Sequence, residues 1–299
     1  PHVFGTLIFV RPSILTNEDD GFLKRLSLGL TYVVDRDAPY VQLESGGFSH
    51  KSVHGVGLDV ELKLYRSEVL RVKSYVDISG LLSPSSAGMG GAIGTLVRAN
   101  ILGRRTHVVR FRLEARLSQP QFIPSYFDLT YNLYRSRFPL HSGQADAKPI
   151  TKLELLEKME NTPSRWGVYA ELIYRMHRRI TGLVAFEDSS WLGEATPSVR
   201  FSGKNLTLMA QFRDFYLPGM NKPFDFYLAY HMRNFEDWTP ILSAEQAHEY
   251  LYASLSLKVW RYLSVDASIR KALSLGIVSA QEAPSSVDAM LGMVLRYEL

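Results

Sequence analysis

The charged residues most able to act on a solute lie at alternate positions of one short stretch. Arg110, Arg112, Glu114 and Arg116 are each separated by a single apolar residue. Because alternate side chains of an extended strand point to the same face, this spacing predicts a row of four ionic groups on one face of a strand. Rows of arginine and lysine that line an aqueous passage favour the binding or passage of anions. The stretch is therefore a candidate wall of a solute path.

Basic residues at matching positions of the preceding segments extend this candidate wall. The residues that we predict to line a lumen and bind solute all alternate with apolar or small neighbours: Arg71, Lys73, Arg98, Arg110, Arg112, Glu114 and Arg116. The alternative is that these charges pair with one another and fill a narrow interior. For any one residue this pairing role is the more common, and for the group the wall of an aqueous lumen is our hypothesis.

Residues suited to catalysis or to metal binding are few. The chain has no cysteine, which excludes thiolate metal sites and cysteine nucleophiles. His50 and His54 flank Ser52, and His141 precedes Ser142, but neither group has the spacing of a hydrolase motif. A third metal ligand beside the two histidines is not evident, and no glycine-rich phosphate-binding motif occurs. We therefore expect no catalytic residue, no enzyme activity, no metal and no cofactor.

The elements that must position these charges are long segments in which hydrophobic and polar residues alternate. Most approach the ~9–11 residues with which a tilted strand crosses a bilayer, whereas strands of soluble proteins average ~5–6 residues. Fourteen segments follow the pattern well: 1–10, 25–34, 54–65, 70–79, 91–101, 106–117, 126–134, 165–176, 179–187, 205–215, 224–233, 249–259, 263–270 and 286–299. Segments 40–47 and 197–203 are short, alternate poorly, and would raise the number to sixteen.

This pattern predicts an all-β protein, a transmembrane antiparallel up-and-down β-barrel of about 14 strands (range 12–16), with residues 1–299 as a single domain. A soluble sandwich or a lipocalin-like barrel is the alternative, because it also alternates apolar and polar residues. The length of the segments and the four ionic groups in one row favour the membrane barrel. Residues 1–10 already form a strand pattern, so in an exported protein we expect an upstream signal peptide or domain to be missing.

Composition agrees with this fold class and excludes others. Hydrophobic residues make up 46% of the 299 residues and charged residues 21%, which excludes a disordered chain. No stretch approaches the ~20 apolar residues of a membrane-spanning helix. The net charge of +4 is scattered along the chain instead of concentrated on one face or in a tail. We therefore expect no nucleic-acid partner.

Two of the longer connections carry helix signals. Thr151-Lys152-Leu153-Glu154 has the spacing of a capping box and precedes apolar residues, and Ser243-Ala244-Glu245-Gln246 repeats the spacing more briefly. A helix in such a connection folds into the lumen, docks a partner, or packs on the rim, and packing on the rim is the more ordinary outcome. We predict that loops 135–164 and 234–248 are the places where other envelope proteins would bind.

The end of the chain is a strand whose apolar face continues to the final residue. Apolar residues take every second position from Val287 to the end, and the opposite face is mostly polar. This stretch resembles the C-terminal signal strand of bacterial outer-membrane β-barrels, and the residues that would form the assembly signal are Leu291, Gly292, Leu295, Tyr297 and Leu299. It departs from the common form at Met290, where a polar residue is expected, and at the last residue, which is leucine instead of phenylalanine.

The resemblance implies a place in the bacterial outer membrane, contact with outer-membrane lipid, and insertion by the barrel-assembly machinery. Our leading hypothesis for the task is a pore or transporter for small polar solutes, anions among them. The alternative is a structural barrel that anchors an envelope-spanning machine for secretion, motility or polymer export through its loops. A hydrolase active at the rim of the barrel is a third hypothesis, which requires a histidine and a nucleophile that converge in space.

Overall fold

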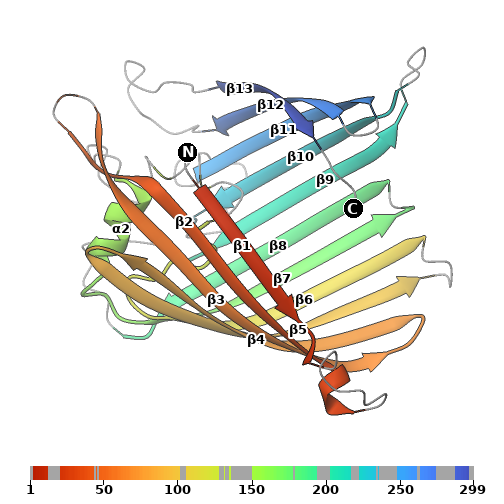
Figure 1. The fold of residues 1–299 in the computed structure, drawn as a ribbon, viewed down its shortest axis with the longest axis horizontal. Coiled ribbons are helices and arrows are strands. Elements are labelled where there is room, and N and C mark those ends of the chain that lie inside the picture. Colours follow the sequence, from red (N-terminus) through yellow and green to blue (C-terminus); the bar gives the residue numbers. More distant parts are fainter. Residues whose placement is uncertain are drawn as a thin grey trace.

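The fold is one antiparallel sheet in which 13 strands follow one another in chain order (Figure 1). The computed structural model describes residues 3–12, 21–43, 45, 47–101, 106–127, 131, 135, 150–177, 179–193, 203–216, 222–233, 235, 248–260, 263–273 and 287–295. The strands are β1 (Val3–Val10), β2 (Leu26–Gln42), β3 (Phe48–Arg66), β4 (Leu70–Ser83), β5 (Ser86–Ile101), β6 (His107–Ser118), β7 (Arg165–Met176), β8 (Ile180–Trp191), β9 (Asn205–Phe215), β10 (Phe224–Arg233), β11 (His248–Trp260), β12 (Leu263–Leu273) and β13 (Val287–Leu295).

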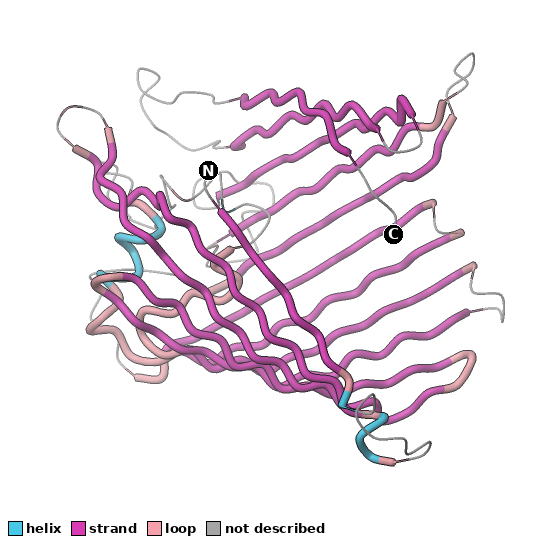
Figure 2. Tube along the Cα trace, viewed as in Figure 1, coloured by secondary structure: helices cyan, strands magenta, loops and turns pink. Residues whose placement is uncertain are grey.

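The sheet bends strongly, so its first strands lie in front of its middle strands. Figures 1 and 2 show β1 passing in front of β6, β7 and β8 while the intervening strands form the bend. Each strand pairs antiparallel with the next one along the chain. Because direction alternates over 13 strands, β1 and β13 run the same way, and any direct pairing between them would be parallel.

The all-β, up-and-down prediction is confirmed, and the preferred number of 14 strands is wrong for the described residues. Of the segment predicted as a strand at 126–134, the structure describes residues 126, 127 and 131, and none of these lies in a strand. Tyr126 and Phe127 lie in a turn, and Tyr126 and Tyr131 are buried with other apolar residues of the same connection. The described apolar residues whose alternation predicted a strand pack in this small core and do not lie on a face of the sheet. Segment 40–47 begins as the end of β2, and segment 197–203 lies almost wholly outside the described residues.

The helix signal at Thr151 is confirmed. Helix α2 (Lys152–Lys158) begins after Thr151, whose side chain accepts a hydrogen bond of 3.0 Å from the backbone N–H of Glu154. The second signal, at Ser243–Gln246, lies outside the described residues. A short 3-10 helix, η2 (Phe22–Lys24), precedes β2. Within the part of the chain that the structure describes, no helix has the length and apolar character needed to cross a membrane.

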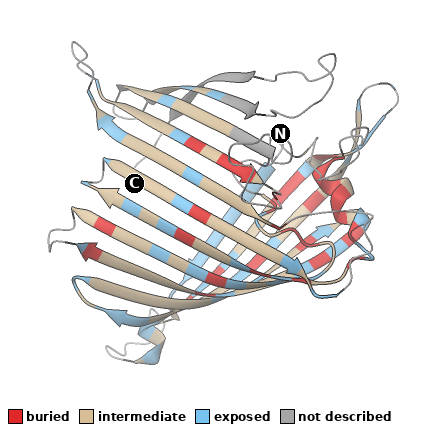
Figure 3. Cartoon of the chain, turned by 180° about the vertical axis from the view of Figure 1, so that it is seen from behind, coloured by how far each residue is buried: buried red, intermediate tan, exposed pale blue. Residues whose placement is uncertain are grey.

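The two faces of the sheet differ in a way opposite to that of a soluble protein. In β6, Phe111, Leu113 and Leu117 are 40–55% exposed, whereas Glu114 and Ser118 on the other face are buried. Figure 3 shows the same alternation of exposed, intermediate and buried residues along neighbouring strands. We call the apolar, exposed face the outer face and the polar face the inner face. The inner face is the concave side on which the connection between β6 and β7 packs.

Connections differ between the two ends of the strands. At one end, which we call the turn rim, most connections are short: 67–69, 102–106, 177–179 and 261–262, beside the longer 11–25 and 216–223. At the other end, the loop rim, most connections are long: 119–164, 192–204, 234–247 and 274–286, beside the short 43–47 and 84–85. Each rim therefore has four connections of its own kind and two exceptions.

The β6–β7 connection covers the inner face near the loop rim. Glycines make room for it: a Cβ atom at Gly90 would lie 2.3 Å from the ring of Phe122, and one at Gly88 would lie 2.3 Å from the backbone of Gln121. Helix α2 then buries Leu153, Leu155 and Leu156 together with strand residues on the inner face. The remaining buried members of this cluster are Ala38, Val53, Leu81, Phe122, Ile123, Tyr126, Tyr131, Ile150 and Met159.

Candidate functional site

The candidate site is the polar inner face of β3 to β8. Its side chains come from every second residue of each strand, and the register of the ladders places them in rows across the sheet. The row nearest the turn rim consists of Arg66, Arg71, Arg98 and Arg110, which are direct partners on four consecutive strands. We call it the arginine row. The next row toward the loop rim begins with the partners Lys63 and Lys73.

A second group of charges forms a paired network in the middle of the inner face. Glu114, which is buried, accepts hydrogen bonds from Tyr75 and from Arg116, whose Nη2 lies 2.6 Å from Oε2 of Glu114. Arg112 is more distant, with Nη1 3.5 Å from Oε1 of Glu114. The guanidinium group of Arg116 also lies over the ring of Tyr169, 4.1 Å from its centre. Glu114 is therefore held by donors from β4 and from its own strand.

Two further glutamates complete the network from neighbouring strands. Glu171 on β7 pairs with Arg110 at 2.9 Å and accepts a hydrogen bond of 3.1 Å from the hydroxyl of Tyr169. Glu187 on β8 pairs with Arg116 at 2.7 Å. Three arginines are thus matched by three glutamates, so this part of the wall carries no net charge. Charge pairs that satisfy one another in this way hold neighbouring strands in register.

The predicted wall therefore divides into two parts with different chemistry. Arg110, Arg112, Glu114 and Arg116 belong to the paired network. Lys73 pairs with Glu61 at 2.6 Å. Arg71 and Arg98 lie in the arginine row, beyond the network. All seven predicted residues occupy inner-face positions, and the structure places them on three neighbouring strands, β4, β5 and β6.

Sequence reasoning did not connect three of the partners with the site. Glu187 lies in a segment whose polar face is weakly charged, so its spacing alone gave no sign of a partner. Tyr75 reaches across a neighbouring strand, which strand spacing does not indicate. Arg66 lies just beyond the predicted strand 54–65, but β3 continues through it after an irregular pairing between Lys63 and Tyr65. An irregularity of this kind adds one residue to a strand and shifts the facing of those that follow.

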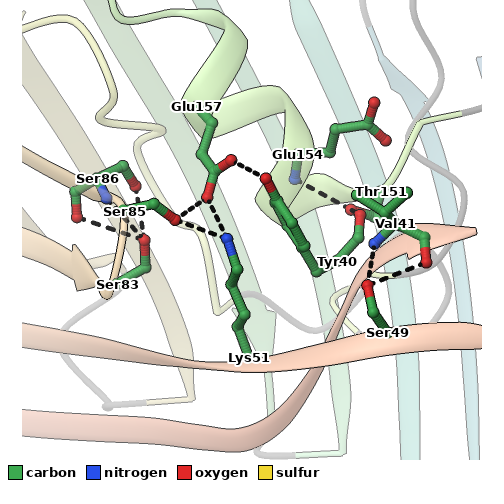
Figure 4. Close-up of polar contacts among 10 residues, drawn as sticks. All are labelled: Tyr40, Val41, Ser49, Lys51, Ser83, Ser85, Ser86, Thr151, Glu154 and Glu157. Atoms are coloured by element: carbon green, nitrogen blue, oxygen red, sulfur yellow. Dashed lines mark hydrogen bonds and ion pairs between the residues drawn. The ribbon is translucent and has the colours of Figure 1, made fainter.

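A second polar cluster ties helix α2 to the sheet at the loop rim (Figure 4). Glu157 on the helix accepts hydrogen bonds from Tyr40 on β2, from Ser85 between β4 and β5, and from Lys51 on β3. Nζ of Lys51 lies 3.1 Å from Oε1 of Glu157 and 3.3 Å from the centre of the Tyr40 ring. Burial acts to raise the pKa of Glu157, but these donors outweigh it and hold that pKa below its usual value. We call these four residues the Glu157 latch.

Buried groups hold the rest of the connection against β2. The carboxylate of Asp35 is buried and accepts a hydrogen bond of 2.9 Å from the hydroxyl of Tyr131. Arg135 pairs with the same carboxylate at 3.1 Å. Burial raises the pKa of Tyr131, so its hydroxyl remains a donor over the ordinary pH range. Part of the loop predicted at 135–164 to bind partners is therefore packed on the sheet of its own chain.

The other predicted sites are placed as follows. Leu291, Gly292 and Leu295 lie in β13, and Tyr297 and Leu299 lie outside the described residues. Of loop 234–248, only residues 235 and 248 are described. Among the histidines, Nδ1 of His54 lies 2.8 Å from the hydroxyl of Tyr32, and His50 lies 3.2 Å from Asp37. In the described part of the chain, no group of three or more His, Asp or Glu side chains is placed to hold a metal ion.

The likeness of this chain to known proteins is weak. No family model matches the chain, and no curated protein matches it. Among solved structures, CdiB from Acinetobacter baumannii superposes with a TM-score of 0.44 and 11% sequence identity. The match covers 91% of this chain and 47% of that one, so this chain spans about half the length of CdiB. A likeness at this level does not establish a family.

Proposed function

We propose that this protein is a bacterial outer-membrane β-barrel whose polar inner face lines a passage for small polar solutes. The observation that carries the proposal is the reversed distribution of side chains, with apolar residues exposed on the outer face and charged residues buried on the inner face. A soluble sheet would bury the apolar face against a core. A barrel in a bilayer places that face against lipid and the polar face toward a lumen.

The apolar outer face continues from strand to strand. Leu30, Leu58 and Ile78 are direct partners on β2, β3 and β4, and each is 46–48% exposed. A second row runs through Phe111 and Leu172 to Val184 and Leu208 on the following strands. Soluble monomers rarely expose a contiguous apolar patch larger than a few hundred Å². Lipid is the environment that such a surface fits.

The backbone supports the same proposal. In hydrocarbon every backbone N–H and C=O group needs a partner, so a sheet that spans a membrane must close and leave no free edge. We propose that the bent sheet closes between the regions of β1 and β13. The rims also differ as they do in outer-membrane barrels, which have short periplasmic turns and longer extracellular loops. This assigns the turn rim to the periplasm and the loop rim to the outside.

Assembly partners follow from the resemblance at the end of the chain. The apolar residues of β13 and of the positions after it would be recognised by the barrel-assembly machinery. The matched variants Leu299→Asp and Glu298→Gln separate recognition from a general effect of substitution near the end. The first is expected to lower the amount of barrel inserted in cells several-fold, and the second is not. Equal insertion of the two variants would remove this role from the final residues.

The alternative is a structural barrel that anchors an envelope-spanning machine. Two observations favour it: the mid-wall charges are paired, and the β6–β7 connection covers part of the inner face at the loop rim. Both narrow the lumen. The arginine row, in contrast, offers charge to a solute at the turn rim. The pore and the anchor therefore differ in whether water and ions cross the barrel.

Planar-bilayer recording of the purified protein, with electrophoresis of heated and unheated samples, separates these functions. A pore gives stable conductance steps together with a heat-dependent shift in mobility. A plugged anchor gives the mobility shift without conductance, and pull-down from solubilised envelopes would then find its partners. A protein with neither property would be a soluble sheet, and the membrane proposal would be wrong.

A further inference from the structure

We propose that the arginine row forms a binding site for an oxyanion, a solute bearing a phosphate or carboxylate group, at the turn rim of the lumen. This inference rests on the proposed function and adds the chemical class of the solute. The site consists of Arg66, Arg71 and Arg98, with Lys63 in the neighbouring row. It lies outside the paired network, which begins at Arg110.

The placement of Arg66 directly opposite Arg71 is unfavourable unless a negative charge joins them. The register makes Arg66 the partner of Arg71 and Arg71 the partner of Arg98. Like charges directly opposite each other on paired strands destabilise a sheet. The next residue of the row, Arg110, is joined to Glu171 at 2.9 Å, which shows how the same wall neutralises an arginine elsewhere. Among the described residues, Arg66 and Arg71 have no equivalent ion pair.

No carboxylate of the described residues pairs with Arg66 or Arg71. Glu61, the nearest acidic residue of β3 along the chain, is bound to Lys73 at 2.6 Å. The Nε atom of Arg71 is buried from solvent and makes no hydrogen bond with the described residues. A buried donor without an acceptor costs about 1–3 kcal/mol, so the position favours a bound acceptor. A solute oxyanion supplies both the acceptor and the charge.

The surroundings add further positive charge. Among the described residues, Arg11, Arg66 and Lys73 lie close enough to Lys63 to repel its charge, and Glu61 opposes them. A cluster of one sign at the mouth of a lumen raises the local concentration of solutes of the opposite sign.

The residue type indicates an oxyanion instead of a simple halide. Arginine presents a planar fork of N–H donors that matches two oxygens of a phosphate or carboxylate at once. A lysine in the same position would attract any anion as a point charge. Neighbouring forks on adjacent strands, about 5 Å apart, can share the oxygens of one phosphate. The site is therefore expected to bind phosphate more strongly than chloride.

The test is conductance of the purified protein in planar bilayers, with inorganic phosphate added on one side of a chloride solution. Phosphate is expected to reduce the chloride current at concentrations where added chloride has no such effect. Arg71→Gln should weaken this block about tenfold, because one charge-assisted pair is lost. Arg71→Lys should keep the anion preference and still weaken the block. Lys158→Gln on α2 removes the same charge far from the site and should leave the block unchanged.

The outcomes separate this inference from the proposed function. If the protein conducts but phosphate does not block it, the oxyanion site is overturned and the pore remains. The same holds if phosphate blocks the wild type and Arg71→Gln equally. Absence of both conductance and membrane insertion would overturn the proposed function itself. If Lys158→Gln weakens the phosphate block as much as Arg71→Gln does, the effect is one of net charge. That result would also overturn the site. A double variant, Arg66→Gln/Arg71→Gln, is expected to abolish the block while the conductance steps persist.

Discussion

The hydroxyl group of Tyr75 donates a hydrogen bond to Oε1 of Glu114 from two strands away. The two residues lie in one row of the sheet, with Gly94 between them on β5. A Cβ atom at Gly94 would lie 2.5 Å from the hydroxyl and Cζ atoms of Tyr75. The glycine therefore provides the path by which β4 reaches the centre of the charge network on β6.

We predict that Gly94→Ala destabilises the folded protein by about 2 kcal/mol, because it displaces the donor of a buried carboxylate. The measurement is the free energy of unfolding in urea, with the protein refolded into detergent or vesicles. Gly57→Ala is the matched control, because its Cβ would meet its nearest neighbours at 3.6 Å. In the double variant with Tyr75→Ala, the alanine at position 94 should cost less than it does alone. If Gly94→Ala costs the same free energy of unfolding with and without Tyr75→Ala, the side chain of Tyr75 does not require the space that Gly94 leaves.

The facing of β6 gives a second prediction. Leu113 lies on the outer face in the middle of the strand and is 46% exposed, so Leu113→Arg places a charge against lipid. We expect a cost of about 2–4 kcal/mol and poor insertion. Arg112→Ala should be tolerated, because Arg112 lies 3.5 Å from Glu114 and 3.9 Å from Glu171, and each glutamate keeps a closer arginine. Similar insertion of the two variants would reverse the assigned faces.

The network itself gives a third prediction. Arg116 holds both Glu114 and Glu187, and its side chain is 14% exposed. Arg116→Met leaves two carboxylates short of a cation, and we expect a loss of about 3–5 kcal/mol in the free energy of unfolding. Adding Glu187→Gln should recover part of that loss, because it removes one of the unpaired charges. If the double variant is as unstable as the sum of the single ones, Arg116 and Glu187 are not coupled.

Sequence pattern predicted the long strands and their faces because a sheet with one apolar and one polar face repeats one rule at every second residue. It placed Arg110, Arg112, Glu114 and Arg116 on one face, where the structure has them. It did not predict which charges pair, because pairing depends on register between strands, and Tyr75 and Glu187 come from other strands. The alternation of apolar and polar residues gave a wrong prediction at 126–134. Tyr126 and Tyr131 pack in the core of a connection and do not lie on a face of the sheet.

The Glu157 latch gives a prediction for pH. Because its donors hold the pKa of Glu157 below the usual value, the carboxylate contributes stability that is present at neutral pH and is lost as pH falls through that lowered pKa. Protection of the α2 amides against hydrogen exchange, measured relative to the intrinsic exchange rate at each pH, should therefore fall in the wild type only below about pH 4. In Glu157→Gln the α2 amides should be less protected than in the wild type at neutral pH, and their protection should not fall further when the solution is acidified.

Lys158→Gln serves as the control for the latch. Its amine pairs at 2.9 Å with Glu154 on the same helix and makes no described contact with the sheet. It should leave the exchange of α2 near that of the wild type. If Glu157→Gln and the wild type exchange alike at neutral pH, the latch does not hold the helix on the inner face.

The central claim is that one face of the sheet meets lipid and the other meets water, and β5 tests it most directly. The chain has no cysteine, so single cysteines can be placed without background. Ala92 and Leu96 occupy inner-face positions, and Ile93 and Val97 occupy outer-face positions. In vesicles, a charged thiol reagent should modify cysteines at the two inner positions and spare those at the two outer ones. Equal modification at all four positions, or preference for the outer pair, would contradict a water-lined barrel in a membrane.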